Sequence, residues 1–291
     1  MSAILNAKRN ARSVVGERIR KTANPREKKA ALEEAKALKK DATELESKLA
    51  ELDDQLLSLA LAIPNDTHPS SPLGPESAAV ILSTHGPKPI PTSPARDHVT
   101  VGRALELMDL EAGATVTGSS WYYLLNEGAL LEIALTNYAL SIALKHGFSP
   151  VTTPDVVRSD IAQRCGFQPR DHDTDPPASQ MYYIANHTTS APQYTHPELV
   201  LSGTAEIPLA GLFANKLLPP NVLPMKVVGL GRSFRAEAGA RGSETRGLYR
   251  VHQFSKLELF AVAQEGQSEG VMEDMRKVQV EIYSGLGFPF R

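Results

Sequence analysis

The sequence predicts an α+β protein, in which an antiparallel helical arm precedes a domain whose helices flank an antiparallel sheet. Three observations predict this fold. Within residues 38–59, apolar residues recur at alternating spacings of four and three, the pattern of a coiled-coil seam. Eight prolines then interrupt residues 63–94. Within residues 227–262, two strand-like runs flank a short loop of Gly, Ala and charged residues.

The composition is that of an ordinary globular protein. The chain has 291 residues, 42% hydrophobic and 22% charged, and a net charge of −2. This length supports a sizeable core and about two domains. The single cysteine, Cys165, excludes an intrachain disulfide. No apolar stretch reaches the roughly 18 residues that a transmembrane helix requires.

The first element is an arm of two helices. Pro25 at a first helical turn, after Asn24 as N-cap, predicts a helix over residues 25–62, about 57 Å long at 1.5 Å per residue. A shorter helix ending near Lys21 would lie antiparallel to it. The seam of the longer helix consists of Leu38, Ala42, Leu45, Leu49, Leu52, Leu56 and Leu59. Because the two helices differ in length, either the far half of the seam packs elsewhere or an N-terminal portion is missing; the second is favoured.

Charge is unevenly distributed along the arm. Residues 1–40 contain 12 Lys and Arg against 4 Asp and Glu, whereas residues 41–62 contain 1 against 6. A basic segment therefore exists in spite of the near-neutral total. The basic start of the chain fits either a transit peptide or a surface helix.

The remaining chain divides into a proline-rich linker, residues 63–94, and a domain, residues 95–291. In this domain Leu130–His146 is expected to be helical, with Gly147 as its stop. Leu199–Ile207 is expected to be a strand that brings Thr204 and Glu206 to one face.

Alternation separates the two faces of the second run in residues 227–262. One face carries Arg250, His252, Phe254, Lys256 and Glu258. The other face carries Tyr249, Val251, Leu257, Leu259 and Ala261, and should pack in the core. Arg235 and Glu237 share a face of the first run. This hairpin would suit an anionic, aromatic ligand; the alternative is a solvated sheet face with cross-strand ion pairs.

Common nucleotide and metal motifs are absent from the sequence. It contains no GxxxxGK[ST] loop, and Gly229-Leu-Gly231 lacks the third glycine of a dinucleotide fingerprint. No Cys or His spacing indicates zinc, so no metal ligands are assigned. A nucleotide would therefore be held by side chains on a sheet.

These segments together resemble a known family, the seryl-tRNA synthetases among the class II aminoacyl-tRNA synthetases. FRAEAGARGSETRGLYRVHQFSKLELF, residues 234–260, resembles motif 2 of class II enzymes, and SGTAEIPL, residues 202–209, resembles the serine-binding TAE segment. Residues 130–154 resemble motif 1, the dimerisation element. Residues 4–61 and 62–74 resemble the tRNA-binding arm and the junction that follows it.

The resemblance implies a serine–tRNA ligase, which activates L-serine with ATP to seryl-adenylate and transfers it to the 3′ end of tRNA(Ser). The ATP-contacting residues would be Arg235, Ala236, Glu237, Arg250, Val251 and Phe254. The serine-contacting residues would be Thr204, Ala205, Glu206, Arg235 and Glu258. Mg²⁺ would offset the charge of the triphosphate.

Specific roles follow from the same resemblance. Arg235 would bind the α-phosphate and stabilise charge during serine attack, as the catalytic residue. Glu237 would accept from the adenine amino group, Arg250 would hold the outer phosphates and Phe254 would stack on adenine. Thr204 and Glu258 would hold the serine hydroxyl and ammonium, with Glu206 lining that pocket.

The family also implies partners and a compartment. The arm would grip tRNA through phosphates and hydroxyls, using Arg12, Arg18, Arg20, Lys21, Arg26, Lys28 and Lys29. A solvated coiled-coil face or a protein-binding arm is the alternative. A homodimer through the motif 1 region is expected, and no membrane partner. The sequence of residues 234–260 resembles that of the bacterial and organellar branch, which favours the mitochondrial matrix over the cytoplasm.

The chain also departs from the family pattern. It ends at GLGFPFR, where the family continues into further strands and motif 3, and its start is short. The domain is therefore expected to be an incomplete class II catalytic domain. Poor or absent serine activation by this chain alone is expected, and a non-catalytic relative that binds tRNA or dimerises with a full-length subunit is the alternative.

Overall fold

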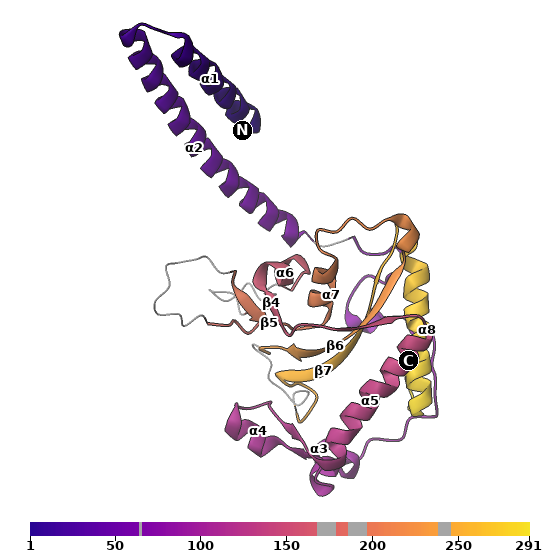
Figure 1. The fold of residues 1–291 in the computed structure, drawn as a ribbon. Helices are drawn as coiled ribbons and strands as arrows, with labels where there is room; N and C mark the ends of the chain where they lie inside the picture. Colours follow the sequence, from indigo (N-terminus) through magenta and orange to yellow (C-terminus); the bar gives the residue numbers. More distant parts are fainter. Residues whose placement is uncertain (64–65, 168–178, 186–196, 238–245) are drawn as a thin grey trace. The chain divides into compact units, whose positions relative to one another are not determined.

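The computed structural model has two compact units, Met1–Pro69 and Ser70–Arg291, and each is described by itself. It describes residues 1–63, 66–167, 179–185, 197–237 and 246–291 (Figure 1). Residues 166–197 are rich in Asp, His, Thr and Pro, a composition that predicts an irregular insertion, and most of them lie outside these ranges.

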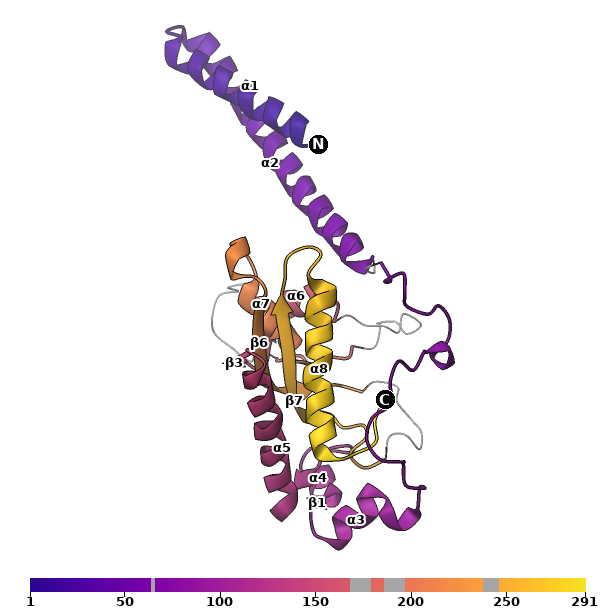
Figure 2. The same ribbon diagram turned by 90° about the vertical axis from the view of Figure 1, so that its right-hand side faces the viewer.

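The first unit is the predicted helical hairpin. Helix α1 spans Ser2–Lys21 and helix α2 spans Pro25–Ala62, side by side in both ribbon views (Figures 1 and 2). The Asn24 side chain accepts from the Arg26 N–H at 3.0 Å, which satisfies an otherwise unpaired donor of the first turn. The predicted boundaries and N-cap are confirmed.

The seam is only partly covered within this unit. Leu5 and Val15 of α1 are buried, as are Ala31 and Ala42 of α2. Leu52, Leu56 and Leu59, at the other end of α2, remain 41%, 65% and 69% exposed. The length difference between the helices, 20 against 38 residues, accounts for this exposure.

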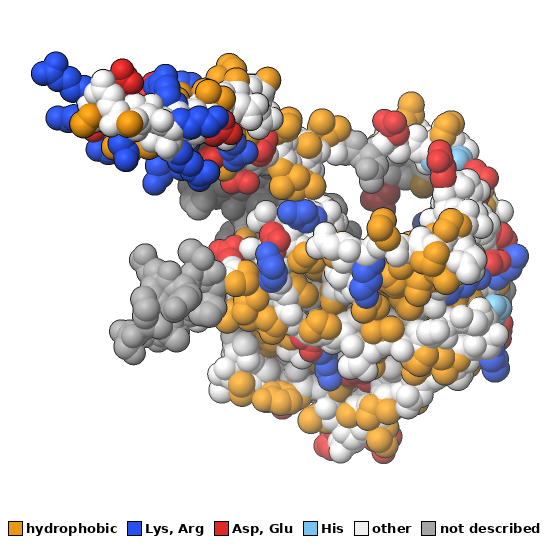
Figure 3. Space-filling view, turned by 45° about the horizontal axis from the view of Figure 1, so that its top comes forward, with side chains coloured by type: hydrophobic (Ala, Val, Ile, Leu, Met, Phe, Trp, Pro, Cys, Tyr) orange, Lys and Arg blue, Asp and Glu red, His pale blue; other side chains and the backbone are white. Residues whose placement is uncertain are grey.

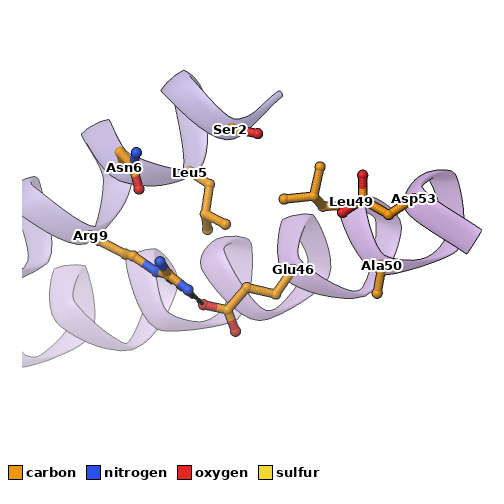
Figure 4. Close-up of a pocket in the computed structure, with 8 residues that line it drawn as sticks. All are labelled: Ser2, Leu5, Asn6, Arg9, Glu46, Leu49, Ala50 and Asp53. Atoms are coloured by element: carbon orange, nitrogen blue, oxygen red, sulfur yellow. Dashed lines mark hydrogen bonds and ion pairs between the residues drawn. The ribbon is translucent and has the colours of Figure 1, made fainter. Parts of the chain in front are cut away.

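Charged pairs join the two helices along the covered part. Arg9 Nη2 lies 2.8 Å from Glu46 Oε1, and the dashed line in Figure 4 marks this pair beside Leu5 and Leu49. Lys8–Asp41 and Arg18–Glu34 also join α1 to α2. Since each pair links one particular residue of α1 to one of α2, the three favour a single antiparallel register.

The second unit begins with an extended segment. Its only regular turns between Ser70 and Asp97 are the 3₁₀ turns η1, Glu76–Ala78, and η2, Pro94–Arg96, as far as the described residues go. His85 pairs with Phe290 in an isolated β-bridge. The dense prolines explain the absence of a longer helix or strand in this described stretch.

Short elements lead into the central helix. Helix α3, His98–Ala104, precedes strand β1, Met108–Asp109, helix α4, Leu110–Val116, and strand β2, Tyr123–Leu124, which pairs antiparallel with β1. Helix α5 spans Asn126–Lys145, and Gly147 at φ +80° follows it. The expected helix and its glycine stop are confirmed.

The strand expected at Leu199–Ile207 is shorter than predicted. Strand β5 spans only Leu199–Leu201 and pairs antiparallel with β4, Val156–Arg158. The Ser202 hydroxyl donates to the Thr204 carbonyl at 2.7 Å, so the chain turns there and helix α7, Glu206–Phe213, begins. Helix α6, Ser159–Arg164, packs nearby, and the turn η3, Pro220–Val222, follows α7.

The central sheet has the order β3-β6-β7. Strands β6, Met225–Phe234, and β7, Gln253–Val262, form the predicted antiparallel hairpin. Strand β3, Ser149–Thr152, runs parallel to β6, so the sheet is mixed rather than antiparallel. This pairing joins segments more than 70 residues apart, and the long connection allows the parallel direction. The α+β fold class is otherwise confirmed.

Helices cover the two faces of this sheet unequally. Helices α5 and α8, Ser268–Leu286, pack on one face, and Figure 2 shows them flanking the hairpin. Val228 of β6 and Leu257 and Leu259 of β7 contact them there, as alternation predicted for the two leucines. On the other face, α7 packs Leu209 against Val227 and Phe260. The end of this face near Phe234 and Gln253 carries the polar residues described next.

No helix in the part of the chain that the structure describes combines the length and apolar character needed to cross a bilayer.

Candidate functional site

The candidate site lies on the sheet face that α7 covers at one end only. The strand register places Gly229 opposite Glu258, Gly231 opposite Lys256 and Ser233 opposite Phe254. A Cβ at Gly231 would lie 2.9 Å from Thr153 Oγ1, and one at Gly229 would lie 2.9 Å from Leu209 Cδ1. The two glycines therefore let neighbouring elements approach the strand closely beside the charged residues of β7.

A three-residue polar network forms next to these glycines. Lys256 Nζ lies 2.7 Å from Glu258 Oε2 and donates to Thr204 Oγ1 at 3.0 Å. The Thr204 hydroxyl in turn donates to Glu258 Oε2 at 3.4 Å. Thr204 is 5% exposed and the Glu258 side chain 15%. A carboxylate and a hydroxyl thus converge at a position suited to an ammonium group, which Lys256 fills.

The three residues of the TAE segment do not share one face of a strand. Ala205 is 2% exposed and packs with Leu209 and Val227. Glu206 is exposed at the first turn of α7, because the strand has already ended at Leu201. The expectation that Thr204 and Glu206 lie together on a strand face is therefore wrong, and only Thr204 contacts Glu258.

Arg235 follows β6 and lies between the turn after β5 and the aromatic ring of Phe254. Its Nε donates to the Gly203 carbonyl at 3.3 Å, and its guanidinium carbon is 5.1 Å from the Phe254 ring centroid. The Arg235 N–H donates to the His252 carbonyl at 2.9 Å, which continues the hairpin ladder past the strand end. A planar cation is thereby held against an aromatic face.

Glu237 and Arg250 form the outer ion pair of the hairpin. Arg250 Nε lies 3.3 Å from Glu237 Oε2, and the Glu237 side chain is 19% exposed. Glu237 has φ +49°, a left-handed conformation that is uncommon for a residue other than glycine. The Ala236 N–H donates to the Gln180 carbonyl at 3.0 Å, which fixes the backbone beside it. Such local strain is typical of functional sites.

Alternation predicts the burial of residues 249–252, which precede β7, less well than that of β7 itself. Strand β7 begins at Gln253, so Arg250 and His252 precede it. Val251 is buried, as expected for the core-facing set. The assignment of Tyr249 to the same set is wrong, because Tyr249 is 73% exposed. Its ring packs against the His98 ring, with the two centroids 4.3 Å apart.

Three aromatic side chains meet beside Arg235. His252 Nδ1 lies 2.9 Å from the Arg235 carbonyl and 2.8 Å from Tyr182 Oη. The Trp121 ring stacks on His252 with centroids 5.6 Å apart. Burial, followed by the charge of Glu237, raises the pKa of Tyr182. Alternation places His252 near the site, but nothing local in the sequence connects Trp121 or Tyr182 to it.

The arrangement suits an anionic ligand with an aromatic ring. Two arginines, the half-buried ring of Phe254 and two carboxylates with side chains 19% and 15% exposed gather at this end of the hairpin. Such limited exposure disfavours the alternative of a solvated face with cross-strand pairs. Among the described residues, no group of three or more His, Cys, Asp and Glu side chains could hold a metal ion. Both site carboxylates are already paired with cations.

The basic residues of the arm form a separate candidate surface. Figure 3 shows Lys and Arg side chains crowding the helical arm. Arg18 pairs with Glu34, and Lys21 lies 3.9 Å from Glu17. The remaining predicted residues are exposed and have no ion pair within the described ranges: Arg12, Arg20, Arg26, Lys28 and Lys29.

Comparison with known sequences identifies the class of domain. Residues 188–291 match the family of tRNA synthetase class II core domains (G, H, P, S and T). The chain is 40% identical over 274 residues to the mitochondrial serine–tRNA ligase of Schizosaccharomyces pombe, covering 94% of this chain and 55% of that protein. It is 40% identical over 230 residues to the serine–tRNA ligase of Treponema denticola, covering 79% and 51%. The chain spans about half the length of these relatives.

Solved structures that superpose on this chain include enzymes of the same kind. The seryl-tRNA synthetase of Pyrococcus horikoshii, solved in complex with ATP, superposes with a TM-score of 0.74 at 29% identity. That match covers 99% of this chain and 66% of the other. The cytoplasmic serine–tRNA ligase of Naegleria fowleri, at 24% identity and a TM-score of 0.69, has the same fold.

Proposed function

We propose that this chain binds ATP and L-serine for serine–tRNA ligation, because it is about 40% identical to serine–tRNA ligases and its residues 188–291 match a class II core domain. One observation carries the proposal. Phe254 and Glu258 share one half-buried face of β7, where Arg235 lies against the first and Thr204 contacts the second. That face offers an anion contact, an aromatic platform and an ammonium acceptor together.

ATP would occupy the Arg235 end of this face. The Arg235 guanidinium would contact the α-phosphate, Phe254 would offer a face to the adenine and Glu237 would accept from its amino group. Arg250, beside Glu237, would contact the outer phosphates. When a serine carboxylate oxygen attacks the α-phosphorus, the bond to the bridging oxygen breaks and pyrophosphate leaves with that electron pair. Arg235 would stabilise the charge that builds on the α-phosphate oxygens.

Serine would occupy the Thr204 end. Its ammonium would compete with Lys256 for Glu258 Oε2 and Thr204 Oγ1, the two oxygens that Lys256 now contacts. Buried groups that hydrogen-bond a substrate hydroxyl reject analogues that lack it far better than an apolar pocket does. Alanine should therefore be a poor ligand.

Mg²⁺ enters the proposal only as the counter-ion that accompanies the triphosphate. The paired state of Glu237 and Glu258, and the lack of a three-ligand cluster among the described residues, do not fit a metal held by these side chains alone. No step is assigned to the ion.

A nucleotide-analogue experiment tests this function. The full chain is titrated with a non-hydrolysable seryl-adenylate analogue and with the alanyl analogue, by calorimetry. The seryl compound should bind at least about 10-fold more tightly. Equal affinities, or no binding of either, would contradict the proposal. Binding of tRNA without either analogue would instead favour a non-catalytic synthetase-like protein.

The arm would bind tRNA(Ser) through its exposed cations. Replacing Arg26, Lys28 and Lys29 together by Ala should weaken binding of a serine tRNA and reduce the salt dependence by about one unit of slope for each phosphate that is no longer neutralised. Arg9→Ala is the matched control, because Arg9 is paired with Glu46. Equal affinities of the triple variant and the control would contradict this assignment.

A homodimer through α5 is the proposed assembly. Leu130, Leu131 and Ile133 of this helix are 65%, 55% and 58% exposed, an apolar patch of the kind that marks an interface. Leu131→Asp should convert a dimer to a monomer in sedimentation equilibrium; a wild-type chain that is monomeric at micromolar concentration would refute the assembly.

We propose a location in the mitochondrial matrix, because the similar enzymes of Schizosaccharomyces pombe and Saccharomyces cerevisiae are mitochondrial serine–tRNA ligases; the similar enzyme of Treponema denticola is bacterial. Fractionation of the native cells tests this assignment, and recovery from the cytosol alone would contradict it.

A further inference from the structure

The chain that returns to β7 rests against the start of α3. Residues 246–249 directly precede Arg250, and three contacts and the close approach of Gly247 join them to residues 97–99. We call residues 97–99 and 246–249 the α3 clasp. The clasp joins the start of α3 to the segment that carries Arg250, one of the two site arginines.

His98 makes the central contact of the clasp. Its Nε2 accepts a hydrogen bond from the Leu248 N–H at 3.0 Å, so Nε2 must be unprotonated. The proton of the neutral ring therefore lies on Nδ1, which is buried and has no hydrogen-bond partner among the described residues. The nearest carboxylate oxygen, Asp97 Oδ1, is 3.5 Å away. The Tyr249 ring packs against the imidazole, 4.3 Å between centroids.

Gly247 allows this approach. Its φ is +64°, and a Cβ there would overlap the His98 ring and the Val99 side chain. Only a residue without a side chain brings the next backbone N–H within reach of Nε2 at this position.

An ion pair closes the outer side of the clasp. Arg246 Nη2 lies 3.0 Å from Asp97 Oδ2, and the same carboxylate accepts from the Thr100 N–H at 3.2 Å as the N-cap of α3. Burial acts to raise the pKa of Asp97, but the Thr100 N–H, Arg246 and His98 outweigh it and lower that pKa. The carboxylate thus stays charged beside His98 at neutral pH.

We propose that His98 is a positioning residue whose neutral imidazole holds residues 246–249 and thereby places Arg250 beside Glu237. The inference rests on the proposed function in one respect, that Arg250 is a ligand contact for ATP phosphates. The clasp itself stands on the contacts of His98, Gly247 and Asp97, whatever the ligand is.

A proton on Nε2 would convert the acceptor into a donor and break the contact with Leu248. The charged groups facing His98 are the Asp97 carboxylate of its own segment and the Arg246 guanidinium of the opposing limb; Tyr249 contributes a neutral ring.

Two substitutions at His98 test the role of the hydrogen-bond acceptor. His98→Ala removes the acceptor, whereas His98→Gln keeps an amide oxygen that can accept from the Leu248 N–H. Gly247→Ala displaces the Leu248 N–H from the other side. His146→Ala is the matched control, since His146 pairs with Glu281 between α5 and α8. Trp121, the single tryptophan, reports through its fluorescence that each variant is folded.

Hydrogen–deuterium exchange of the Leu248 amide at one neutral pH is the first measurement. His98→Ala and Gly247→Ala should raise exchange about 3- to 10-fold over wild type, the value of one neutral hydrogen bond. His98→Gln should restore protection, and His146→Ala should leave it unchanged.

The second measurement is the affinity of the full chain for MgATP, which should fall about 3- to 10-fold in His98→Ala and recover in His98→Gln. Unchanged exchange in His98→Ala, or no rescue by glutamine, would overturn the clasp. Changed exchange with unchanged affinity would overturn the positioning of Arg250. A wild type that does not bind MgATP would refute the proposed function instead, and the exchange data alone would then decide the clasp.

Discussion

The ion pairs of the arm and those of the hairpin differ in how much solvent reaches them. Arg9 and Glu46 of the arm have side chains 55% and 44% exposed, whereas Lys256 and Glu258 are 31% and 15% exposed. Solvent screens the first pair and largely spares the second. The arm therefore uses charge to select a register, whereas the hairpin holds its charged groups in a half-buried position, which suits the proposed ligand site.

The glycines of the arm and of the hairpin differ in how closely other atoms approach them. Gly16 of α1 has open space where a Cβ would lie, but Gly229 and Gly231 of β6 face neighbouring side chains at 2.9 Å. A glycine in the arm is a weak point of a helix, and a glycine in the hairpin is a packing requirement.

The largest expected effect is that of overfilling the hairpin. Gly229→Val would force its side chain against Leu209 and Thr153, and should cost about 1–3 kcal/mol of unfolding free energy. Urea denaturation followed by Trp121 fluorescence measures it. An unchanged midpoint and slope would show that α7 does not pack as closely as described.

A double-mutant cycle compares the charged pairs directly. Alanine substitutions at Lys256 and Glu258, singly and together, should give a coupling free energy of about 1–2 kcal/mol, because the pair is partly buried. The same cycle on Arg9 and Glu46 should give about 0–0.5 kcal/mol. Equal coupling energies in the two cycles would remove the distinction between the regions.

The arm glycine should respond in the opposite sense. Gly16→Ala should stabilise the arm by about 0.5–1 kcal/mol, since alanine restricts the unfolded chain and meets no neighbour. Thermal unfolding monitored by circular dichroism at 222 nm reports the helical arm. Destabilisation would mean that this face of α1 is covered by something that the described residues do not include.

The smallest expected effect concerns pH. The folded-state pKa of Asp97 lies below its ordinary value of 3.8, so its stabilising contribution is present above that value and disappears as the pH falls through the folded-state pKa. The stability difference between wild type and Asp97→Asn should therefore be constant from about pH 7 to 5 and shrink below about pH 4. A difference that grows on acidification would reverse the sign of the linkage.

Local patterns in the sequence account for much of this fold. The start and end of α2 follow from Asn24, Pro25 and the leucine spacing, which depend only on neighbours a few residues away. Alternation likewise separates Leu257 and Leu259 from Glu258 without reference to any partner strand.

Long-range contacts account for the features that local patterns do not predict. The parallel pairing of β3 with β6, and the gathering of Trp121 and Tyr182 around His252, join segments far apart in the chain. After β5 ends at Leu201, the Ser202 hydroxyl bonds to the Thr204 carbonyl and the Ser202 N–H to the Asp155 carbonyl, contacts that local patterns do not predict. His98 has no local signal either, since its role depends on residues 246–249.

Calorimetric titration of the full chain with MgATP tests the central claim, that the polar end of the β6–β7 hairpin is a nucleotide site. Arg235→Ala should weaken binding at least about 10-fold, the value of a charge-assisted contact. Arg232→Ala, on the same strand but paired with Glu132 of α5, should leave the affinity unchanged. Equal affinities of the two variants, or no binding by the wild type, would contradict the account.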